Sequence, residues 1–142
     1  MLIHYVNYIA EDIPGSMTEV QNMRENMFSI VNCSGLPHIF LTLNPSDTNN
    51  PVAQVFAGQN INLDKFFDEL DSGVESLMCA TCISQNPIAG AQFFHHSVTT
   101  LLEILLGTKQ ANHKGIFGKV SVYYGVVEAQ GQGSLHIHML LW

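Results

Sequence analysis

Two histidines stand one residue apart in an apolar segment with the composition of a strand, His136-Ile137-His138. Successive side chains of an extended strand point to opposite faces, so His136 and His138 share one face. Neutral imidazole is the side chain that most often binds metals, and two imidazoles on one face can bind the same cation. Two hydrogen-bonded histidines on a half-buried sheet are the alternative interpretation, and the His-x-His spacing alone favours it.

The segment before these histidines supplies a third potential ligand, Glu128. Residues 120–128 are rich in β-branched and aromatic side chains, and the turn-forming run 130–134 separates them from the histidines, which predicts a β-hairpin. Pairing about the middle of that run sets Glu128 opposite His136, and directly opposed residues point to the same face. The hairpin is therefore expected to present Glu128, His136 and His138 together, as a three-ligand metal site with open positions for water or a phosphate oxygen.

Four segments spread over nearly the whole chain carry a family resemblance. They are residues 40–47 (FLTLNPSD), 86–90 (NPIAG), 124–131 (YGVVEAQG) and 135–138 (LHIH). In this order they resemble the Rep-type rolling-circle endonucleases that have a His-hydrophobic-His motif. The resemblance is closer still to the Helitron-like N-terminal domain of eukaryotic rolling-circle transposons.

The resemblance implies a metal-dependent enzyme that nicks single-stranded DNA and transfers the cut strand, in a longer nuclear protein that continues into a helicase domain. It implies that His136, His138 and Glu128 bind a divalent metal, with Mg²⁺ or Mn²⁺ expected in function. The expected partners are single-stranded DNA and the helicase domain. No targeting signal or membrane-spanning segment is recognised in the chain.

In this family the nucleophile is a tyrosine on a helix downstream of the His motif, and this chain ends at Trp142. Tyr123 and Tyr124 precede the motif, so the nucleophile role is not assigned to them. The expectation is a fragment with residues 1–13 as a connecting segment and 14–142 as the endonuclease domain, truncated before the catalytic tyrosine, which is expected downstream of Trp142. Whether the chain itself is an enzyme is left open.

Two other functions remain open. A non-catalytic remnant of the same domain would keep the fold and bind only metal or DNA, which the missing tyrosine favours. A cupin-like non-haem iron oxygenase also uses two histidines and a carboxylate. In that class the glutamate normally follows the His-x-His motif, whereas Glu128 precedes it, so the oxygenase is the less favoured function.

The charge of the chain gives a divided indication about DNA. The 142 residues carry a net charge of −7, whereas free-standing DNA-binding domains are usually basic. Three of the five cationic residues nevertheless fall in one short segment, as Lys109, Lys114 and Lys119. They are expected to form a weak DNA contact beside the metal ligands, and a solvated loop is the alternative.

The elements that must position this site are predicted from capping residues and apolar periodicity. Ser16 and Glu19 have the capping-box spacing, and Asn86-Pro87 marks another helix start. The predicted order is helix 17–33, strand 37–43, loop 48–60, a helix capped by Asn62 and ending at Leu70, helix 74–85, helix 88–106, strand 117–128 and strand 135–141.

This order indicates an α+β fold, with helices packed on one face of an antiparallel sheet. The family resemblance sharpens it to a ferredoxin-like, RNA-recognition-motif-like fold that is incomplete at the C-terminus. Helix 88–106 needs an apolar partner of its own length, so we expect it to pack on the sheet face that bears Ile137 and Met139.

The remaining metal-ligating side chains are expected to lie outside the site. Cys79 and Cys82 form a single C-x-x-C without a second pair, so small buried hydrophobic residues are favoured over a zinc site. His95 and His96 are expected to be structural or solvated. His38, in strand 37–43, is expected to be a hydrogen-bonded sheet histidine, and a position near the site is the alternative.

Overall fold

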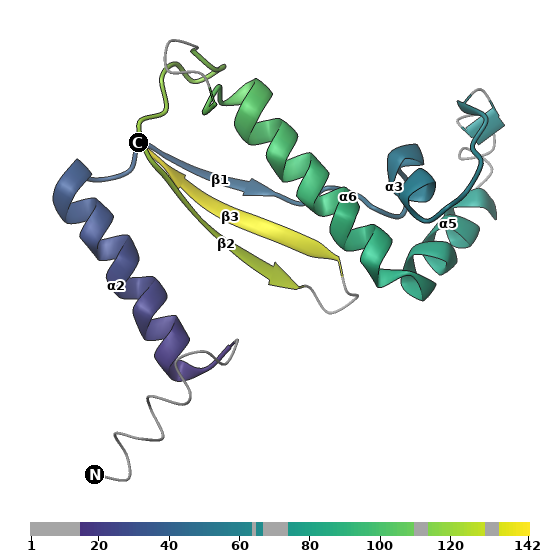
Figure 1. The fold of residues 1–142 in the computed structure, drawn as a ribbon, viewed down its shortest axis with the longest axis horizontal. Coiled ribbons are helices and arrows are strands. Elements are labelled where there is room, and N and C mark those ends of the chain that lie inside the picture. The colour runs from purple at the N-terminus through teal and green to yellow at the C-terminus, as the bar shows by residue number, and fades with distance from the viewer. Residues whose placement is uncertain (1–14, 64, 67–73, 110–113, 130–133) are drawn as a thin grey trace, which may run out of the picture.

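The computed structural model describes residues 15–63, 65–66, 74–109, 114–129 and 134–142 (Figure 1). Its elements, in order, are α2 (Met17–Ser34), β1 (Ile39–Leu43), α3 (Pro51–Phe56), α5 (Val74–Gln85), α6 (Pro87–Thr100), the π-helical turn η1 (Leu101–Leu105), β2 (Tyr123–Ala129) and β3 (Leu135–Leu141). The predicted connecting segment 1–13, residues 64 and 67–70 of the helix predicted after Asn62, and residues 130–133 of the predicted turn lie outside the described residues. The predicted α+β class is confirmed.

Strand β3 is the centre of an open, antiparallel sheet with the order β1-β3-β2. In its register Glu128 is opposite His136, while Val126 and Thr42 flank His138 from the two sides. The register predicted for the hairpin is thus confirmed. Because side chains alternate along each strand, the two histidines and Glu128 share one face, and four apolar side chains of β3 share the other, Leu135, Ile137, Met139 and Leu141.

Helix α6 and the turn η1 cover the apolar face of the sheet, as predicted for helix 88–106. The buried core at this contact consists of Phe94, Leu106, Ile137, Met139 and Leu141. In β2 a Cβ at Gly125 would lie 3.0 Å from side-chain atoms of both Ile137 and Met139. The glycine therefore lets these two side chains lie flat over β2, under the helix.

A second cluster joins α3 and α5 to the first half of α6, beyond the end of the sheet (Figure 1). Its buried side chains are Ala53, Ile83, Ala89 and Phe93. The prediction of a loop at 48–60 is wrong for α3. The Asn50 side chain accepts a hydrogen bond from the backbone N–H of Val52, and Pro51 occupies the first turn. This is the same helix start as Asn86-Pro87, where the Asn86 side chain accepts from Ala89.

Strand β2 begins at Tyr123, so the predicted strand start at residue 117 is wrong. The chain before it forms a tight turn in which Gly115 and Gly118 bridge each other and Gly118 has a φ of 93°. The N–H of Ile116 donates to the carbonyl oxygen of Leu105 (2.8 Å), so this turn is bound to the end of η1. The chain rejoins the sheet only at Ser121, whose N–H donates to Trp142.

Helix α2 begins with the predicted capping box and ends at Gly35, which has a φ of 83°. The Tyr124 hydroxyl donates to the Met23 carbonyl oxygen (2.9 Å), and the Trp142 indole N–H donates to the Gly35 carbonyl oxygen (2.6 Å). Tyr124 and Glu128 both lie on the sheet face away from α6. Helix α2 therefore contacts the sheet from that side. Among the described residues, no helix combines the length and the apolar composition needed to span a bilayer.

Candidate metal centre

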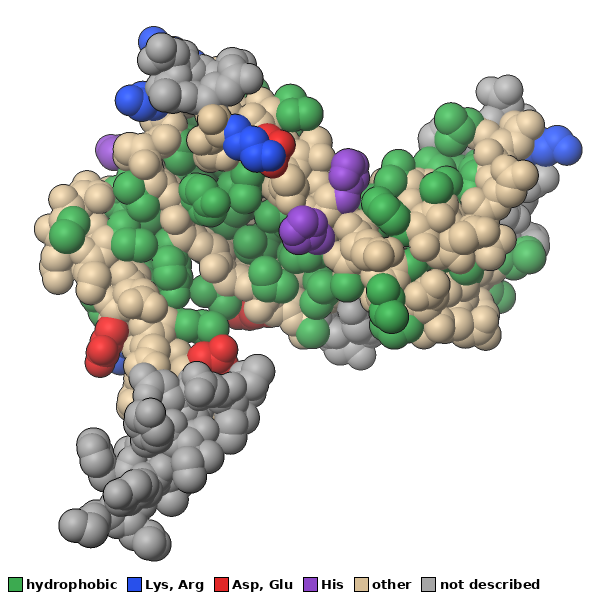
Figure 2. All heavy atoms as spheres, in the orientation of Figure 1, with side chains coloured by type: hydrophobic (Ala, Val, Ile, Leu, Met, Phe, Trp, Pro, Cys, Tyr) green, Lys and Arg blue, Asp and Glu red, His purple; other side chains and the backbone are tan. Residues whose placement is uncertain are grey.

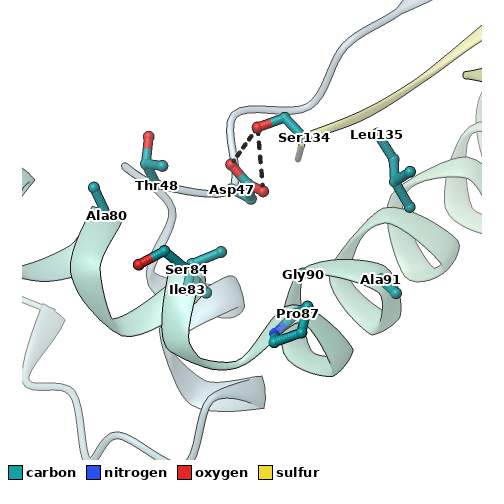
Figure 3. A pocket seen from close by; sticks show the side chains of 10 residues that line it. All are labelled: Asp47, Thr48, Ala80, Ile83, Ser84, Pro87, Gly90, Ala91, Ser134 and Leu135. Carbon is teal, nitrogen blue, oxygen red and sulfur yellow. Dashed lines mark hydrogen bonds between the residues drawn. The ribbon is translucent and has the colours of Figure 1, made fainter. Parts of the chain in front are cut away.

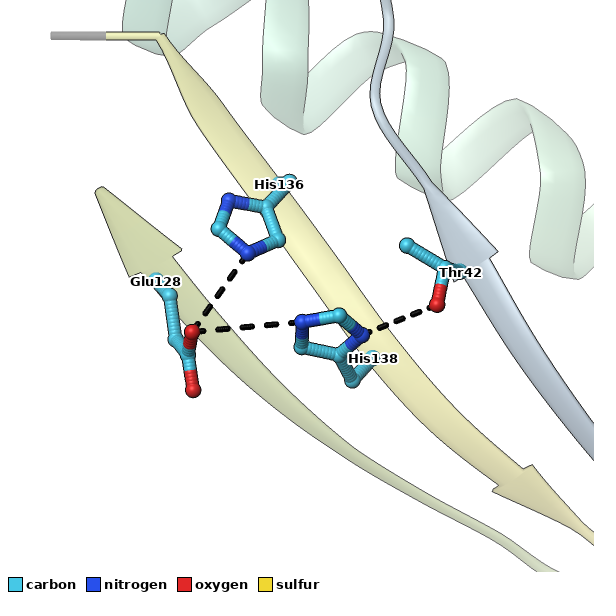
Figure 4. A network of polar contacts seen from close by, with 4 residues as sticks. All are labelled: Thr42, Glu128, His136 and His138. Atoms are coloured by element: carbon cyan, nitrogen blue, oxygen red, sulfur yellow. Dashed lines mark hydrogen bonds and ion pairs between the residues drawn. The ribbon is translucent and has the colours of Figure 1, made fainter. Parts of the chain in front are cut away.

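Glu128, His136 and His138 meet at the end of the hairpin formed by β2 and β3 (Figure 4). The Glu128 Oε2 atom lies 3.4 Å from Nε2 of His136 and 3.9 Å from Nε2 of His138. The two imidazole rings are 4.8 Å apart and nearly perpendicular, at 86°. Glu128 and His136 are close because they are directly opposed across the two strands. His138 lies on the same face because it is two residues after His136.

This donor set fits a metal ion. One ligand atom from each of the three residues lies within 4.8 Å of the others. Nitrogen and carboxylate oxygen bind such ions at about 2 Å, so donors that share one ion stand roughly 3 to 4 Å apart. The Glu128 side chain is 57% exposed and that of His138 is 32% exposed. The outer side of the three donors is therefore open to water or to a phosphate group.

His138 is held in place from strand β1. The Thr42 hydroxyl oxygen lies 2.9 Å from Nδ1 of His138. If this Nδ1 carries the proton and donates it to Thr42, Nε2 is left as the free base that points at Glu128. The ring of Phe40 stacks on the imidazole of His138, with centroids 5.7 Å apart and planes inclined by 11°. A ligand nitrogen fixed by a hydrogen bond at the other ring nitrogen is the usual arrangement in metal sites.

His136 is the buried member of the three, with a side chain only 9% exposed. Its Nδ1 atom is buried and has no hydrogen-bond partner, alone among the buried side-chain nitrogens and oxygens of the described residues. A buried polar atom without a partner costs about 1 to 3 kcal/mol. A purely structural position in an apolar sheet would avoid this cost, so the burial of His136 favours a role for its other nitrogen, Nε2, which faces Glu128.

Two of the three lysines expected beside the metal ligands lie toward the other end of the sheet. Lys109 forms an ion pair with Glu103, and Lys119 precedes Tyr123, the residue at which β2 begins. Glu128 lies near the opposite end of β2, because the strand advances about 3.3 Å per residue. Figure 2 shows Lys and Arg side chains gathered at the upper left, close to where β2 starts in Figure 1. Lys109 and Lys119 are thus not seen in contact with the three donors, and the weak DNA contact of Lys109, Lys114 and Lys119 stays a prediction.

The other metal-ligating side chains stay apart from the three donors. Glu128, His136 and His138 form the only group of His, Cys, Asp or Glu with metal-binding spacing among the residues with defined positions. Cys79 is buried and Cys82 is half-buried, and neither forms a disulfide. His95 and His96 are exposed on α6. The expectation that these four residues lie outside the site agrees with this grouping.

The sequence predicted that Thr42 lies in a strand, on the side opposite to Ile39, Leu41 and Leu43. It did not indicate that Thr42 belongs to the site. Replacing Thr42 by valine keeps the shape of the side chain and removes the oxygen beside Nδ1 of His138. We expect Mn²⁺ affinity to fall about tenfold, since partners of ligating histidines are worth about 10- to 100-fold in affinity. Calorimetric titration measures this, and Thr42→Ser, which keeps the hydroxyl, is the matched control. Equal affinities of Thr42→Val and wild type would contradict the orienting role.

The chain matches one family model over residues 1–141, described as the Helitron helicase-like domain at the N-terminus. No curated protein and no solved structure matches the chain.

Proposed function

Since the chain belongs to the family of Helitron helicase-like N-terminal domains, we propose that it is the metal-binding part of a single-stranded DNA nickase and strand transferase of rolling-circle transposition. In this proposal it acts within a longer nuclear protein that carries a helicase. The observation that supports it is the convergence of Glu128, His136 and His138, whose donor atoms lie within 4.8 Å of one another on one face of the sheet.

A divalent cation at these residues would act as a Lewis acid toward an oxygen of the scissile phosphate. The chain's own residues would bind and orient it. Buried His136 provides a fixed ligand, Thr42 orients His138, and Glu128 supplies a negative charge at the open side. Imidazole ligands favour Mn²⁺ over Mg²⁺, whereas phosphoryl chemistry commonly uses Mg²⁺, so Mn²⁺ is the suitable probe and either ion is proposed for function.

Neither tyrosine of strand β2 has a free hydroxyl aimed at the three ligands, although Tyr124 lies on their face of the sheet. The Tyr124 hydroxyl donates to the Met23 carbonyl oxygen, and Tyr123 alternates onto the opposite face. We therefore propose that the nucleophile is a tyrosine downstream of Trp142, as the family resemblance implies. Its hydroxyl oxygen would form a bond to phosphorus while the bond to the 3′ oxygen breaks, leaving a 5′-phosphotyrosine.

The same tyrosine positions favour the second candidate, a remnant that binds metal or DNA without cutting. The cupin-like oxygenase is not proposed further, because the chain belongs to the Helitron-related family.

The test is a denaturing gel of labelled single-stranded oligonucleotide incubated with Mn²⁺. We expect no covalent adduct with this chain, and an adduct with a longer product that includes the downstream tyrosine. Covalent capture of the DNA strand requires a nucleophile positioned in line with the phosphate. The three metal ligands alone do not provide such a nucleophile. The adduct of the long product should disappear in His136→Ala.

Each other result of this assay has a distinct meaning. An adduct with the present chain that is abolished by Tyr124→Phe would show that the nucleophile is assigned to the wrong residue. An adduct of the long product that survives His136→Ala would remove the three ligands from the reaction. A long product that binds Mn²⁺ but forms no adduct would favour the non-catalytic remnant.

A further inference from the structure

Two of the segments that carry the family resemblance, 40–47 and 86–90, supply no metal ligand, and both reach one pocket beside the metal centre. The pocket has a volume of about 400 Å³. Asp47 comes from the first segment, and Pro87 and Gly90 come from the second. Figure 3 shows the pocket between the α5–α6 junction and the start of β3. Of these two segments, only Phe40 and Thr42 contribute to the function proposed above, through their contacts with His138. The parts of both segments that line the pocket have no role in it, so the pocket has no ligand assigned to it.

The pocket lies close to the metal ligands along the chain of β3. Ser134, in its wall, stands immediately before β3 and two positions before His136, which corresponds to about 7 Å in an extended chain. The Ser134 hydroxyl donates to both carboxylate oxygens of Asp47, at 3.3 and 3.5 Å (Figure 3). The Asp47 carboxylate is thereby held at the end of the sheet where the metal ligands lie. This separation is comparable to one nucleotide of an extended single strand.

The chemistry of the wall selects a flat ligand with a hydrogen-bond donor. Apolar atoms of Ile83, Pro87, Ala91 and Leu135 form much of the lining. The carboxylate of Asp47 is an acceptor with room for more bonds than the one Ser134 hydroxyl provides. A phosphate would be repelled by this charge, and a cation would find no second carboxylate in the lining. A nucleobase with an exocyclic amine offers both an apolar ring face and a donor edge.

We propose that this pocket receives an amine-bearing base of the single-stranded DNA, next to the phosphate at the metal centre, with Asp47 accepting from the amine. The proposal rests on the proposed function, because it needs DNA to cross the three metal ligands. Cytosine, adenine and guanine carry such an amine. Uracil and thymine present a carbonyl oxygen at the corresponding position, and this oxygen would face the carboxylate unfavourably. The pocket thus gives the site a base preference.

Gly90 keeps the pocket open beside Asp47. A Cβ at this position would lie 3.6 Å from Oδ2 of Asp47 and 3.5 Å from Cγ2 of Ile83. These are ordinary contact distances, so the pocket has no spare space at this point for a larger side chain and a ligand together. Ser84 also lines the pocket, but its hydroxyl donates to the Thr81 carbonyl oxygen within the helix. Ser84 is therefore a lining residue whose hydroxyl is already occupied.

The experiment compares oligodeoxycytidylate with oligodeoxyuridylate, which differ at the position of the cytosine amine. Fluorescence anisotropy with Mn²⁺ should show that the chain binds the cytosine strand about tenfold more tightly. In Asp47→Asn the amide can donate or accept, so the two strands should bind within about twofold of each other. Ser84→Ala, the matched control, should keep the wild-type ratio. Mn²⁺ titration of Asp47→Asn should give the wild-type affinity, since Asp47 is not one of the three ligands.

The possible failures can be told apart. If wild type binds neither strand, DNA binding itself fails, and the proposed function and this inference fail together. If wild type binds both strands equally, or Asp47→Asn keeps the tenfold preference, the pocket assignment is overturned while metal-dependent DNA binding stands. If deoxycytidine monophosphate binds as tightly as the oligonucleotide, the occupant is a free nucleotide, and the assignment to a DNA strand is overturned.

Discussion

Manganese affinity is expected to fall by about a hundredfold or more when His136 is replaced by alanine, since loss of even an outer partner of a ligand costs 10- to 100-fold. His136 is the most buried of the three donors, and its Nε2 atom is the donor nearest to the Glu128 carboxylate, at 3.4 Å. Without it, one imidazole and one carboxylate remain. Isothermal titration with Mn²⁺ measures the change. Glu128→Gln should also lower the affinity, and it should leave the fold intact because the Glu128 side chain is exposed.

The control for this prediction is His96→Ala, which removes an exposed histidine of α6 that has no part in the group of three. It should bind Mn²⁺ as wild type does. Protons compete with the metal for imidazole nitrogen and carboxylate oxygen, so wild-type affinity should decrease as the pH is lowered. Equal Mn²⁺ affinity of wild type, His136→Ala and Glu128→Gln would refute the site.

Replacing Gly115 by alanine is expected to lower the free energy of unfolding by about 2 to 3 kcal/mol, the cost of overpacking a closely packed site. A Cβ at this position would lie 2.4 Å from the carbonyl oxygen of Leu105, and 2.6 and 2.7 Å from backbone atoms of Leu106. Backbone atoms cannot rotate away as a side chain can. The turn at 115–118 would have to move off the end of η1 and break the hydrogen bond from Ile116 to Leu105. Urea denaturation followed by circular dichroism measures the loss.

Two other glycines separate the steric effect from the conformational one. Gly118 has a φ of 93°, and a Cβ added there would meet no atom within 4 Å. Gly118→Ala should therefore lower the free energy of unfolding only by the cost of placing alanine in the left-handed conformation, about 1 to 2 kcal/mol. Gly90 is helical with ordinary contacts, and Gly90→Ala should leave stability unchanged or slightly raised. If Gly115→Ala is as stable as wild type, the close approach of the turn to η1 is contradicted.

The hairpin and its ligands could be predicted because they depend on short-range rules. Alternation along β3 places His136 and His138 on one face, and symmetry about the turn places Glu128 opposite His136. The helices at α2 and α6 were predicted from Ser16 and Asn86, whose side chains do cap them. Each of these features depends on residues that are close together in the chain, so it can be predicted from the pattern of residue types.

The features that were missed depend on contacts between distant segments. Thr42 meets His138 only because β1 pairs with β3, and the pattern of residue types does not show which strands are neighbours. The start of β2 is delayed by the contact of Ile116 with Leu105, which local β-propensity does not reveal. Helix α3 is the exception, since Asn50-Pro51 repeats the start of α6 and could have been recognised.

The strand order has a consequence for the sequence of folding events. The central strand β3 is preceded by both of its neighbours, and β1 pairs with it across nearly the whole length of the described chain. Closing so long a loop is slow compared with forming a local hairpin, which takes microseconds. During synthesis β1 therefore leaves the ribosome without a partner, and the apolar face of α6 has no sheet to cover. The β2–β3 hairpin can form first and bring Glu128, His136 and His138 together by itself, and Thr42 reaches His138 only when β1 docks afterwards. Metal binding to the early hairpin would then favour the pairing of β2 with β3 before β1 arrives.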